Sequence, residues 1–342
     1  MSSNRQQVVL VSHEEMAQCF NEILLKTGYL KEKAKQLAKV FTQNSLDGVY
    51  THGVNRFSRF IEYSKNGYVQ KDAEPSVKYK CNGIEQWDGN LGPGILNAIT
   101  ATEQAMKLAD EFGIGCVALS NTNHWMRGGT YGWQAAIAGY AFVGFTNTIA
   151  NMPAHGAKDT KLGNNPLVIA MPYLDTPIVL DMAMSQYSFG SMELSAMKNE
   201  DMKVYGGYDR EGNLTKDPAA ILESRRPLPV GFWKGAGLSL LLDLLAAVLS
   251  GGLSTHELSS RSTEYGLSQI FISINIKNLS NHSSIPALIE SIISDYKRSV
   301  PENEQTSISY PGERVLNSRK RNDETGIPVL KKIWEEILTL NK

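Results

Sequence analysis

The sequence predicts an α/β (α+β) fold in which helices from both chain ends surround a central group of strands. Near both termini, apolar residues recur at the spacing of amphipathic helices, whereas short apolar or alternating runs typical of strands fill the middle. With 342 residues, the chain is also long for a single hydrophobic core. We therefore expect two domains: residues 1–75 together with 285–342 form a helical domain, and residues 76–284 form a central sheet domain.

Composition excludes several classes of partner. The formal net charge is −1, and no run of like charge indicates nucleic acid or a membrane surface. The cysteines, Cys19, Cys81 and Cys116, show neither a metal-ligand pattern nor a disulfide framework, which is typical of a reducing compartment. Residues 1–7 are polar, unlike a signal peptide, and the apolar run 238–249 is too short to span a bilayer. We expect a cytoplasmic protein without a metal, in which residues 238–249 form a core helix.

The N-terminal part predicts two helices in succession. Ser12 and Glu15 have the spacing of a capping box, and apolar residues then recur at helical spacing until Gly28. A second amphipathic helix is expected over residues 31–45.

The segment after this helix carries the first candidate chemistry. His52 precedes Gly53 and lies four residues before Arg56, so a helical conformation would place His52 and Arg56 on one face. A histidine can transfer a proton near neutral pH, and an arginine can hold a carboxylate or polarise an oxygen. The alternative is a surface helix whose arginines are solvated.

The rest of the chain predicts strands first and helices later. Expected strands lie within residues 75–88 and at 116–119, 142–146, 167–171, 177–182 and 269–276. Expected helices lie at residues 95–112, 131–138, 238–249, 285–298 and 328–340. Turn-forming residues dominate 148–166 and 206–218, and Pro311–Glu313 falls in the loop between the last two helices.

The polar segment 120–130 is the second candidate site. It follows an expected strand and precedes an expected helix, which places it at the carboxyl end of a strand, where open sheets bind ligands. It combines His124 and Arg127 with Gly128 and Gly129, and glycines permit close approach of a ligand. The alternative is a structural turn, but the combination favours function.

Two further positions allow both structural and functional interpretations. The Asn165–Pro166 pair fixes an extended entry into the next strand, so a structural role is reasonable. Asp181 closes an apolar strand, where a buried unpaired carboxylate is costly. It therefore faces solvent, or holds a partner such as a ribose hydroxyl or a protonated histidine. The alternative is that it caps the following helix.

Several common motifs are absent. The nearest approach to a Rossmann fingerprint is Gly235-Ala236-Gly237, but Leu240 occupies the place of the third glycine. We therefore reject a Rossmann fold, although other folds also bind NAD. The chain contains no H-E-x-x-H or C-x-x-C metal motif and no G-x-S-x-G nucleophile motif.

Over nearly its whole length, the chain resembles the malate/L-lactate/ureidoglycolate-type dehydrogenases, which lack a Rossmann fold. The motifs that carry the resemblance are His52-Gly53-Val54 with Arg56, Asn123-His124, Asn165-Pro166, Leu180-Asp181-Met182, Lys234-Gly235 and Pro311-Gly312-Glu313. Narrower runs favour the members that reduce a vicinal diketo sugar acid: Gly48–Tyr50, Phe57–Ile61, Asn123–Ala136, Glu211–Lys216 and Phe232–Gly235.

The resemblance implies a two-domain homodimeric subunit with a mixed sheet that binds NADH or NADPH. It implies that His52 donates the proton to a carbonyl. Our own hypothesis adds that Arg56, together with Arg127, holds the substrate carboxylate, and that His124 orients the substrate or the nicotinamide carboxamide. Thr51 stands where the family often has serine, and keeps the hydroxyl. The implied cofactor contacts are Pro177, Ile178, Val179, Leu180, Asp181, Met182, Ala183, Trp233, Lys234, Glu313, Arg314 and Val315.

Two kinds of alternative remain open. The first is the same chemistry on malate or lactate, on ureidoglycolate, or on a cyclic imino acid. The second is a non-redox sugar-acid-binding protein that keeps the carboxylate-holding arginine without the cofactor site.

Overall fold

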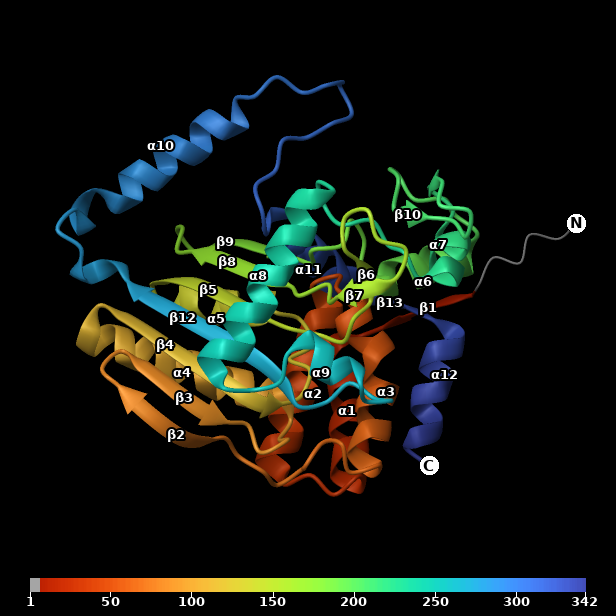
Figure 1. The fold of residues 1–342 in the computed structure, drawn as a ribbon, viewed down its shortest axis with the longest axis horizontal. Helices are drawn as coiled ribbons and strands as arrows, with labels where there is room; N and C mark the ends of the chain where they lie inside the picture. Colours follow the sequence, from red (N-terminus) through yellow and green to blue (C-terminus); the bar gives the residue numbers. More distant parts are fainter. Residues whose placement is uncertain (1–6) are drawn as a thin grey trace, which may run out of the picture.

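The structure of the protein is a computed structural model that describes residues 7–342. Its centre is a seven-stranded sheet with the strand order β2-β3-β4-β12-β5-β8-β9 (Figure 1). The strands are β2 (Ser76–Cys81), β3 (Ile84–Asp88), β4 (Ile114–Thr122), β12 (Leu267–Asn275), β5 (Tyr140–Thr146), β8 (Leu167–Met171) and β9 (Ile178–Met182). Within this sheet β3 and β4 run parallel, and every other neighbouring pair runs antiparallel. The mixed sheet confirms the predicted fold class and the rejection of a Rossmann fold.

Helices cover both faces of this sheet. α4 (Gly94–Phe112) and α5 (Gly129–Ile137) pack on one face, and α8 (Trp233–Ser250) packs on the other. Successive side chains of β4 point to opposite faces of the sheet. Val117 and Leu119 pack in the hydrophobic cluster under α4 and α5, whereas Ala118 packs in the cluster under α8.

The prediction that residues 238–249 form a core helix is wrong for one face of α8. Leu242 and Ala246 are buried against the sheet, but Leu241 is 56% exposed and Val248 is 71% exposed. By length and composition alone, Trp233–Ser250 could cross a membrane, yet a third of the helix is buried against the sheet side of the molecule. An apolar run predicts that a helix has a buried face, but not that all of its faces are covered.

A helical cluster built from both chain ends packs beside the sheet. It contains α1 (His13–Lys26), α2 (Lys31–Leu46), α3 (Val54–Lys65) and α12 (Lys331–Leu340). The strands β1 (Val8–Val11) and β13 (Ile327–Leu330) form an antiparallel pair that joins the two ends. The rings of Phe20 and Phe57 stack at 3.9 Å, and Phe41 meets Phe57 edge-on at 5.2 Å in the centre of the cluster.

Three sequence expectations in the C-terminal part need correction or comment. The helix expected over residues 328–340 begins only at Lys331, because Ile327 and Val329 are buried in the pairing with β1. Glu313, expected in a loop, begins the helix α11 (Glu313–Thr325), whose polar sequence buries only Asn322. Figure 1 shows α10 (Ile285–Lys297) standing apart from the body, with only Ile293 buried.

Smaller elements complete the described chain. The short strands are β6 (Met152–Pro153), β7 (Thr160–Leu162), β10 (Gly207–Tyr208) and β11 (Leu214–Thr215). The remaining helices are α6 (Phe189–Lys198), α7 (Pro218–Ser224) and α9 (Thr255–Ser259), with 3-10 turns η1 (Tyr50–His52), η2 (Ile276–Asn278) and η3 (His282–Ser284).

Candidate active site

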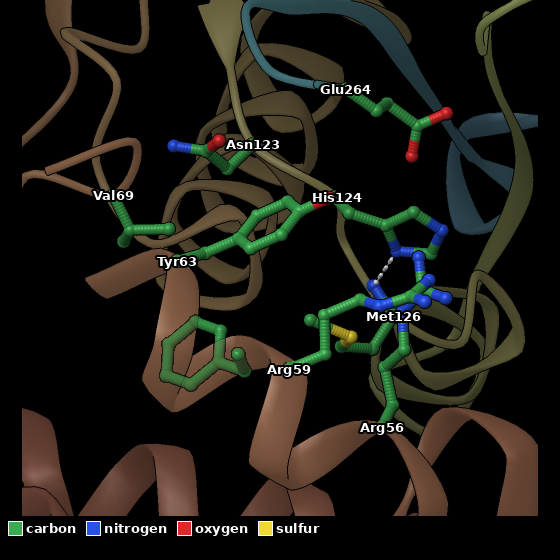
Figure 2. A pocket seen from close by; sticks show the side chains of 9 residues that line it. Arg56, Arg59, Tyr63, Val69, Asn123, His124, Met126 and Glu264 are labelled. Carbon is green, nitrogen blue, oxygen red and sulfur yellow. Dashed lines mark hydrogen bonds between the residues drawn. The ribbon is translucent and has the colours of Figure 1, made fainter. Parts of the chain in front are cut away.

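A pocket lies between α3 and the carboxyl end of β4 (Figure 2). Its lining combines cations, a histidine, a carboxylate and apolar groups: Arg56, Arg59, Phe60, Tyr63, Val69, Asn123, His124, Met126 and Glu264. The two candidate segments of the sequence therefore meet here, one from the helical cluster and one from the sheet.

The sequence before α3 fixes how that helix enters the site. Gly53 packs tightly against α2, because a Cβ at this position would lie 2.8 Å from the backbone nitrogen of Ser45. The Ser45 hydroxyl accepts a hydrogen bond from the backbone N–H of Val54 at 2.8 Å, at the start of α3. One face of α3 then lines the pocket while Phe57 and Ile61 face the helical core.

His52 lies beside the pocket at the end of η1. Its ring is nearly parallel to that of His124, with the centroids 5.7 Å apart and an angle of 18° between the planes. Its Nδ1 lies 3.3 Å from the Thr51 hydroxyl, and its backbone carbonyl accepts a hydrogen bond from Asn44 Nδ2 at 3.0 Å. Burial, followed by the charge of Arg56 and then that of Arg127, lowers the pKa of His52 to about 4. The ring is therefore neutral at pH 7 in this state.

His124 has a defined tautomer. Its Nδ1 accepts a hydrogen bond from the backbone N–H of Met126 at 2.9 Å, shown as the dashed line in Figure 2. The neutral ring therefore carries its hydrogen on Nε2, where it can act as a donor. Burial and the neighbouring charges of Arg56, His52 and Arg59 lower the pKa of His124 well below 6.5, which keeps this donor form at neutral pH.

Arg127 is engaged elsewhere. Its Nη1 forms an ion pair with Asp47, and the same carboxylate accepts a hydrogen bond from Arg319 Nε at 2.7 Å. Arg127 is only 5% exposed, and it is not among the residues that line the pocket. It contributes positive charge near His52 but is held on Asp47, whereas Arg56 lines the pocket directly.

Glu264 is a pocket residue that the sequence reasoning missed. It lies in the turn before β12, and its carboxylate accepts a hydrogen bond from the backbone N–H of Ile149 at 3.2 Å. Burial raises the pKa of Glu264, and the charges of Arg56 and Arg59 oppose this rise. No local motif marks the residue, whereas Arg59 and Tyr63 could have been found from their helical spacing to Arg56.

The three segments assigned to the cofactor converge at β9. The backbone N–H of Val179 donates to the carbonyl of Pro311 at 3.0 Å, which places the start of α11 beside this strand. A Cβ at Gly312 would lie 3.2 Å from the backbone nitrogen of Val179, so this approach suits glycine. The N–H of Val230 donates to the carbonyl of Met184 at 2.8 Å, which brings the start of α8 to the end of β9.

Asp181 holds a partner from another element. Its Oδ2 accepts a hydrogen bond from the backbone N–H of Gly129 at 2.8 Å and so caps the first turn of α5. The alternative that Asp181 caps the helix following it in the chain is wrong, because Ser188 caps α6. Crowding by protein atoms raises the pKa of Asp181, although its side chain remains accessible to solvent.

Asn165 has the structural role that its sequence context suggested. It is fully buried, its Oδ1 accepts from the backbone N–H of Thr148 at 3.0 Å, and its Nδ2 donates to the carbonyl of Ser239 at 2.9 Å. It thereby links the loop before β8 to α8.

Comparisons with known proteins agree over the full length. The model of the malate/L-lactate dehydrogenase family matches residues 11–338. Proteins named 2,3-diketo-L-gulonate reductase are 44% identical over 333 residues (Pasteurella multocida strain Pm70) and 42% identical over 332 residues (Klebsiella pneumoniae strain 342), each covering 96% of this chain and 99% of the relative. The crystal structure of malate dehydrogenase from Entamoeba histolytica shares the fold, with a TM-score of 0.92 at 23% identity over 98% of this chain and 97% of that one. This chain therefore belongs to the malate/L-lactate dehydrogenase family.

Proposed function

We propose that this protein reduces 2,3-diketo-L-gulonate to 3-dehydro-L-gulonate with NADH. Membership of the family makes the chain an oxidoreductase and implies a nicotinamide cofactor. The narrower substrate is supported by the names of its relatives at 42% and 44% identity. The observation that carries the chemistry is the grouping of His52, His124 and Arg56 around one pocket.

Arg56 holds the substrate carboxylate in this proposal. Its guanidinium lines the pocket, and burial lowers its pKa because the charged form is removed from water. The substrate carboxylate places a negative charge beside this cation, and an arginine can bind both carboxylate oxygens at once. Arg127 assists only through its charge, because its Nη1 is bound to Asp47.

His52 gains its proton when the substrate binds. The charge of Arg56 is one of the causes that hold its pKa at about 4, and a carboxylate bound to Arg56 offsets that charge. Negative charge that develops on the substrate carbonyl oxygen raises the pKa of His52 further. His52 therefore holds its proton beside the oxygen that receives it. The Thr51 hydroxyl at 3.3 Å from Nδ1 orients the ring and leaves Nε2 for the substrate.

His124 binds the second carbonyl oxygen of the vicinal diketone. Its Nε2–H is the available donor, since Nδ1 is occupied by the backbone N–H of Met126. The stacked rings of His52 and His124 place two nitrogen groups on neighbouring parts of the site, which suits two adjacent oxygens. One histidine supplies a proton, and the other supplies a fixed hydrogen bond.

The segments around β9 fit a dinucleotide by their chemistry. The exposed Lys234 and the N-terminus of the 18-residue helix α8, which has no side-chain cap, suit a diphosphate. The exposed ring of Trp233 offers a surface for a base or ribose. When bound, the reduced nicotinamide supplies a hydride to the carbonyl carbon. The carboxylate of Asp181 disfavours an extra phosphate, and we therefore propose NADH rather than NADPH.

We also propose that the protein acts in the cytoplasm as a homodimer. The exposed apolar face of α8, which includes Leu241, Leu244 and Val248, is the support for assembly. A second copy of the chain would remove this face from water.

The test is oxidation of NADH, followed by its absorbance, with 2,3-diketo-L-gulonate beside pyruvate and oxaloacetate. Strong turnover of the diketo acid alone is expected, and His52→Asn should lower kcat by about 100-fold or more, as is typical for loss of a general acid. Turnover of the simple 2-oxo acids instead would replace the substrate but keep the chemistry. If neither NADH oxidation nor quenching of tryptophan fluorescence by NADH occurs, the result favours a non-redox sugar-acid-binding protein over the proposed reductase.

A further inference from the structure

We propose that Glu264, together with Arg59 and Tyr63, forms a second subsite that recognises the hydroxyl groups on the tail of the substrate. The substrate class rests on the proposed function. The subsite itself rests on the shape and the chemistry of the pocket beyond Arg56.

The lining of the pocket extends along α3 beyond Arg56. From Arg56 to Tyr63, α3 rises by about 10 Å at about 1.5 Å per residue, and both residues line the same pocket. A six-carbon acid is about 6 Å long with C–C bonds of about 1.5 Å. A three-carbon acid held by Arg56 would therefore leave the end near Tyr63 unfilled, whereas a sugar acid would reach it.

The polar groups that line the pocket beside Arg56 are suited to hydroxyls. Among the described residues, Ile149 is the one hydrogen-bond donor to the Glu264 carboxylate, which leaves acceptor positions directed at the pocket. Figure 2 shows Glu264 reaching into the pocket on the side where the His124 ring lies. An ionised carboxylate only accepts hydrogen bonds, and a guanidinium only donates them. Glu264 can therefore accept a hydrogen bond from one hydroxyl of a vicinal diol, while Arg59 donates one to the other hydroxyl.

The charge balance of the pocket argues against a second carboxylate. Glu264 interacts electrostatically with both Arg56 and Arg59, although no ion pair within 4.0 Å involves Glu264 anywhere in residues 7–342. Its negative charge acts on both cations, on Arg56 more strongly than on Arg59, so two arginines and one carboxylate leave one net positive charge in the pocket for a single substrate carboxylate. A neutral polyhydroxy tail fits this pattern better than a dicarboxylic acid does.

A row of aromatic rings leads from Tyr63 in the pocket lining to the turn that carries Glu264. The ring of Tyr63 meets that of Tyr68 at 5.5 Å, and Tyr68 in turn meets Tyr265 at 5.2 Å. Tyr265 directly follows Glu264, so this row of rings and the carboxylate are positioned by the same turn. Aromatic faces pack on the C–H groups of a sugar chain while the polar groups bind its oxygens.

The experiment compares Glu264→Gln with the matched control Glu62→Gln, which changes an exposed glutamate of α3. For Glu264→Gln, kcat/KM with 2,3-diketo-L-gulonate should fall by about tenfold or more, mainly through KM, because a site built for hydroxyls loses its acceptor. The value with pyruvate should stay within about twofold, and that with oxaloacetate should rise. The control should leave all three values unchanged.

Two results of this kinetic comparison would overturn the proposal. An equal loss with all three substrates would mean that Glu264 acts through Arg56 or the fold rather than on the tail. Unchanged kinetics with the diketo acid would remove Glu264 from the subsite. Binding of NADH, followed by tryptophan fluorescence, confirms in each case that the variant is folded.

A binding assay separates this proposal from the proposed function. If the wild-type protein does not turn over the diketo acid, thermal stabilisation by L-gulonate is compared with stabilisation by L-lactate. A preference for gulonate that is lost in Glu264→Gln supports the subsite even though the proposed reaction has failed. Equal stabilisation by the two acids in the wild-type protein refutes the subsite.

Discussion

Replacing Asp47 by asparagine tests how the pocket is held together. Asp47 is 3% exposed and binds two arginines: Arg127 through an ion pair, and Arg319 through hydrogen bonds of 2.7 Å from Nε and 3.1 Å from Nη2. These residues lie at the end of α2, in the segment before α5, and in α11. Asparagine keeps the shape of the side chain but loses the charge, so the buried Arg127 loses its ion-pair partner.

The expected loss is large for one substitution. Breaking a buried ion pair from one side costs about 3–5 kcal/mol, because the remaining charge is left unpaired in the interior. Arg319 is a third exposed and can regain water, so Arg127 accounts for most of the cost. The free energy of unfolding, measured by urea denaturation with far-UV circular dichroism, should fall by this amount without a change in the m-value.

Asp295→Asn is the matched control. It breaks an ion pair with Arg298 of 2.8 Å between side chains that are 78% and 74% exposed. Such a surface pair contributes about 1 kcal/mol or less. If Asp47→Asn costs no more than this control, the buried charges do not hold the three segments together. In a double-mutant cycle, Arg127→Gln should cost less when Asp47 is already asparagine, with a coupling of about 1–3 kcal/mol.

The same site predicts a pH dependence. Burial alone would raise the pKa of Asp47, but the hydrogen bonds and charges of Arg319 and Arg127 outweigh it and lower the pKa below 3.8. The unfolded chain therefore binds the proton more readily than the folded protein does. The stabilisation is fully present above the unfolded pKa of 3.8 and is lost as pH falls through the lower folded value. In urea titrations, Asp47→Asn should lack this acid-dependent component.

Three further predictions concern other parts of the molecule. Asn165→Ala should lower the free energy of unfolding by about 2–3 kcal/mol in urea, because the buried N–H of Thr148 loses its acceptor; a loss as small as that of a surface substitution would contradict the structural role. Leu241→Glu should dissociate the proposed homodimer in analytical ultracentrifugation, and an unchanged sedimentation coefficient would place the interface elsewhere. Arg56→Gln should raise the pKa of His52 above about 4 in an NMR titration, since a neighbouring cation that lowers it is removed; an unchanged pKa would contradict that electrostatic account.

Local signals in the sequence determined much of the helical part and of the central sheet. The Ser12 cap is formed as its spacing predicted, with the hydroxyl accepting from the N–H of Glu15 at 3.1 Å. The spacing of His52 and Arg56 also singled out the segment that the structure places at the pocket, and His124 was found from its loop context. Caps and periodicities are set by residues a few positions apart, so they can be read along the chain.

Only the tertiary structure decided which distant residues meet. The strand at Ile327–Leu330 forms because β1 offers it a partner from the other end of the chain, and this pairing overrides the helical pattern of the residues that follow. Arg127, expected at the substrate, is held by Asp47 together with Arg319. Glu264 faces α3 although nothing in its neighbourhood in the sequence marks it. A buried charge takes the partner that the fold brings within reach, and sequence spacing carries no information about such contacts.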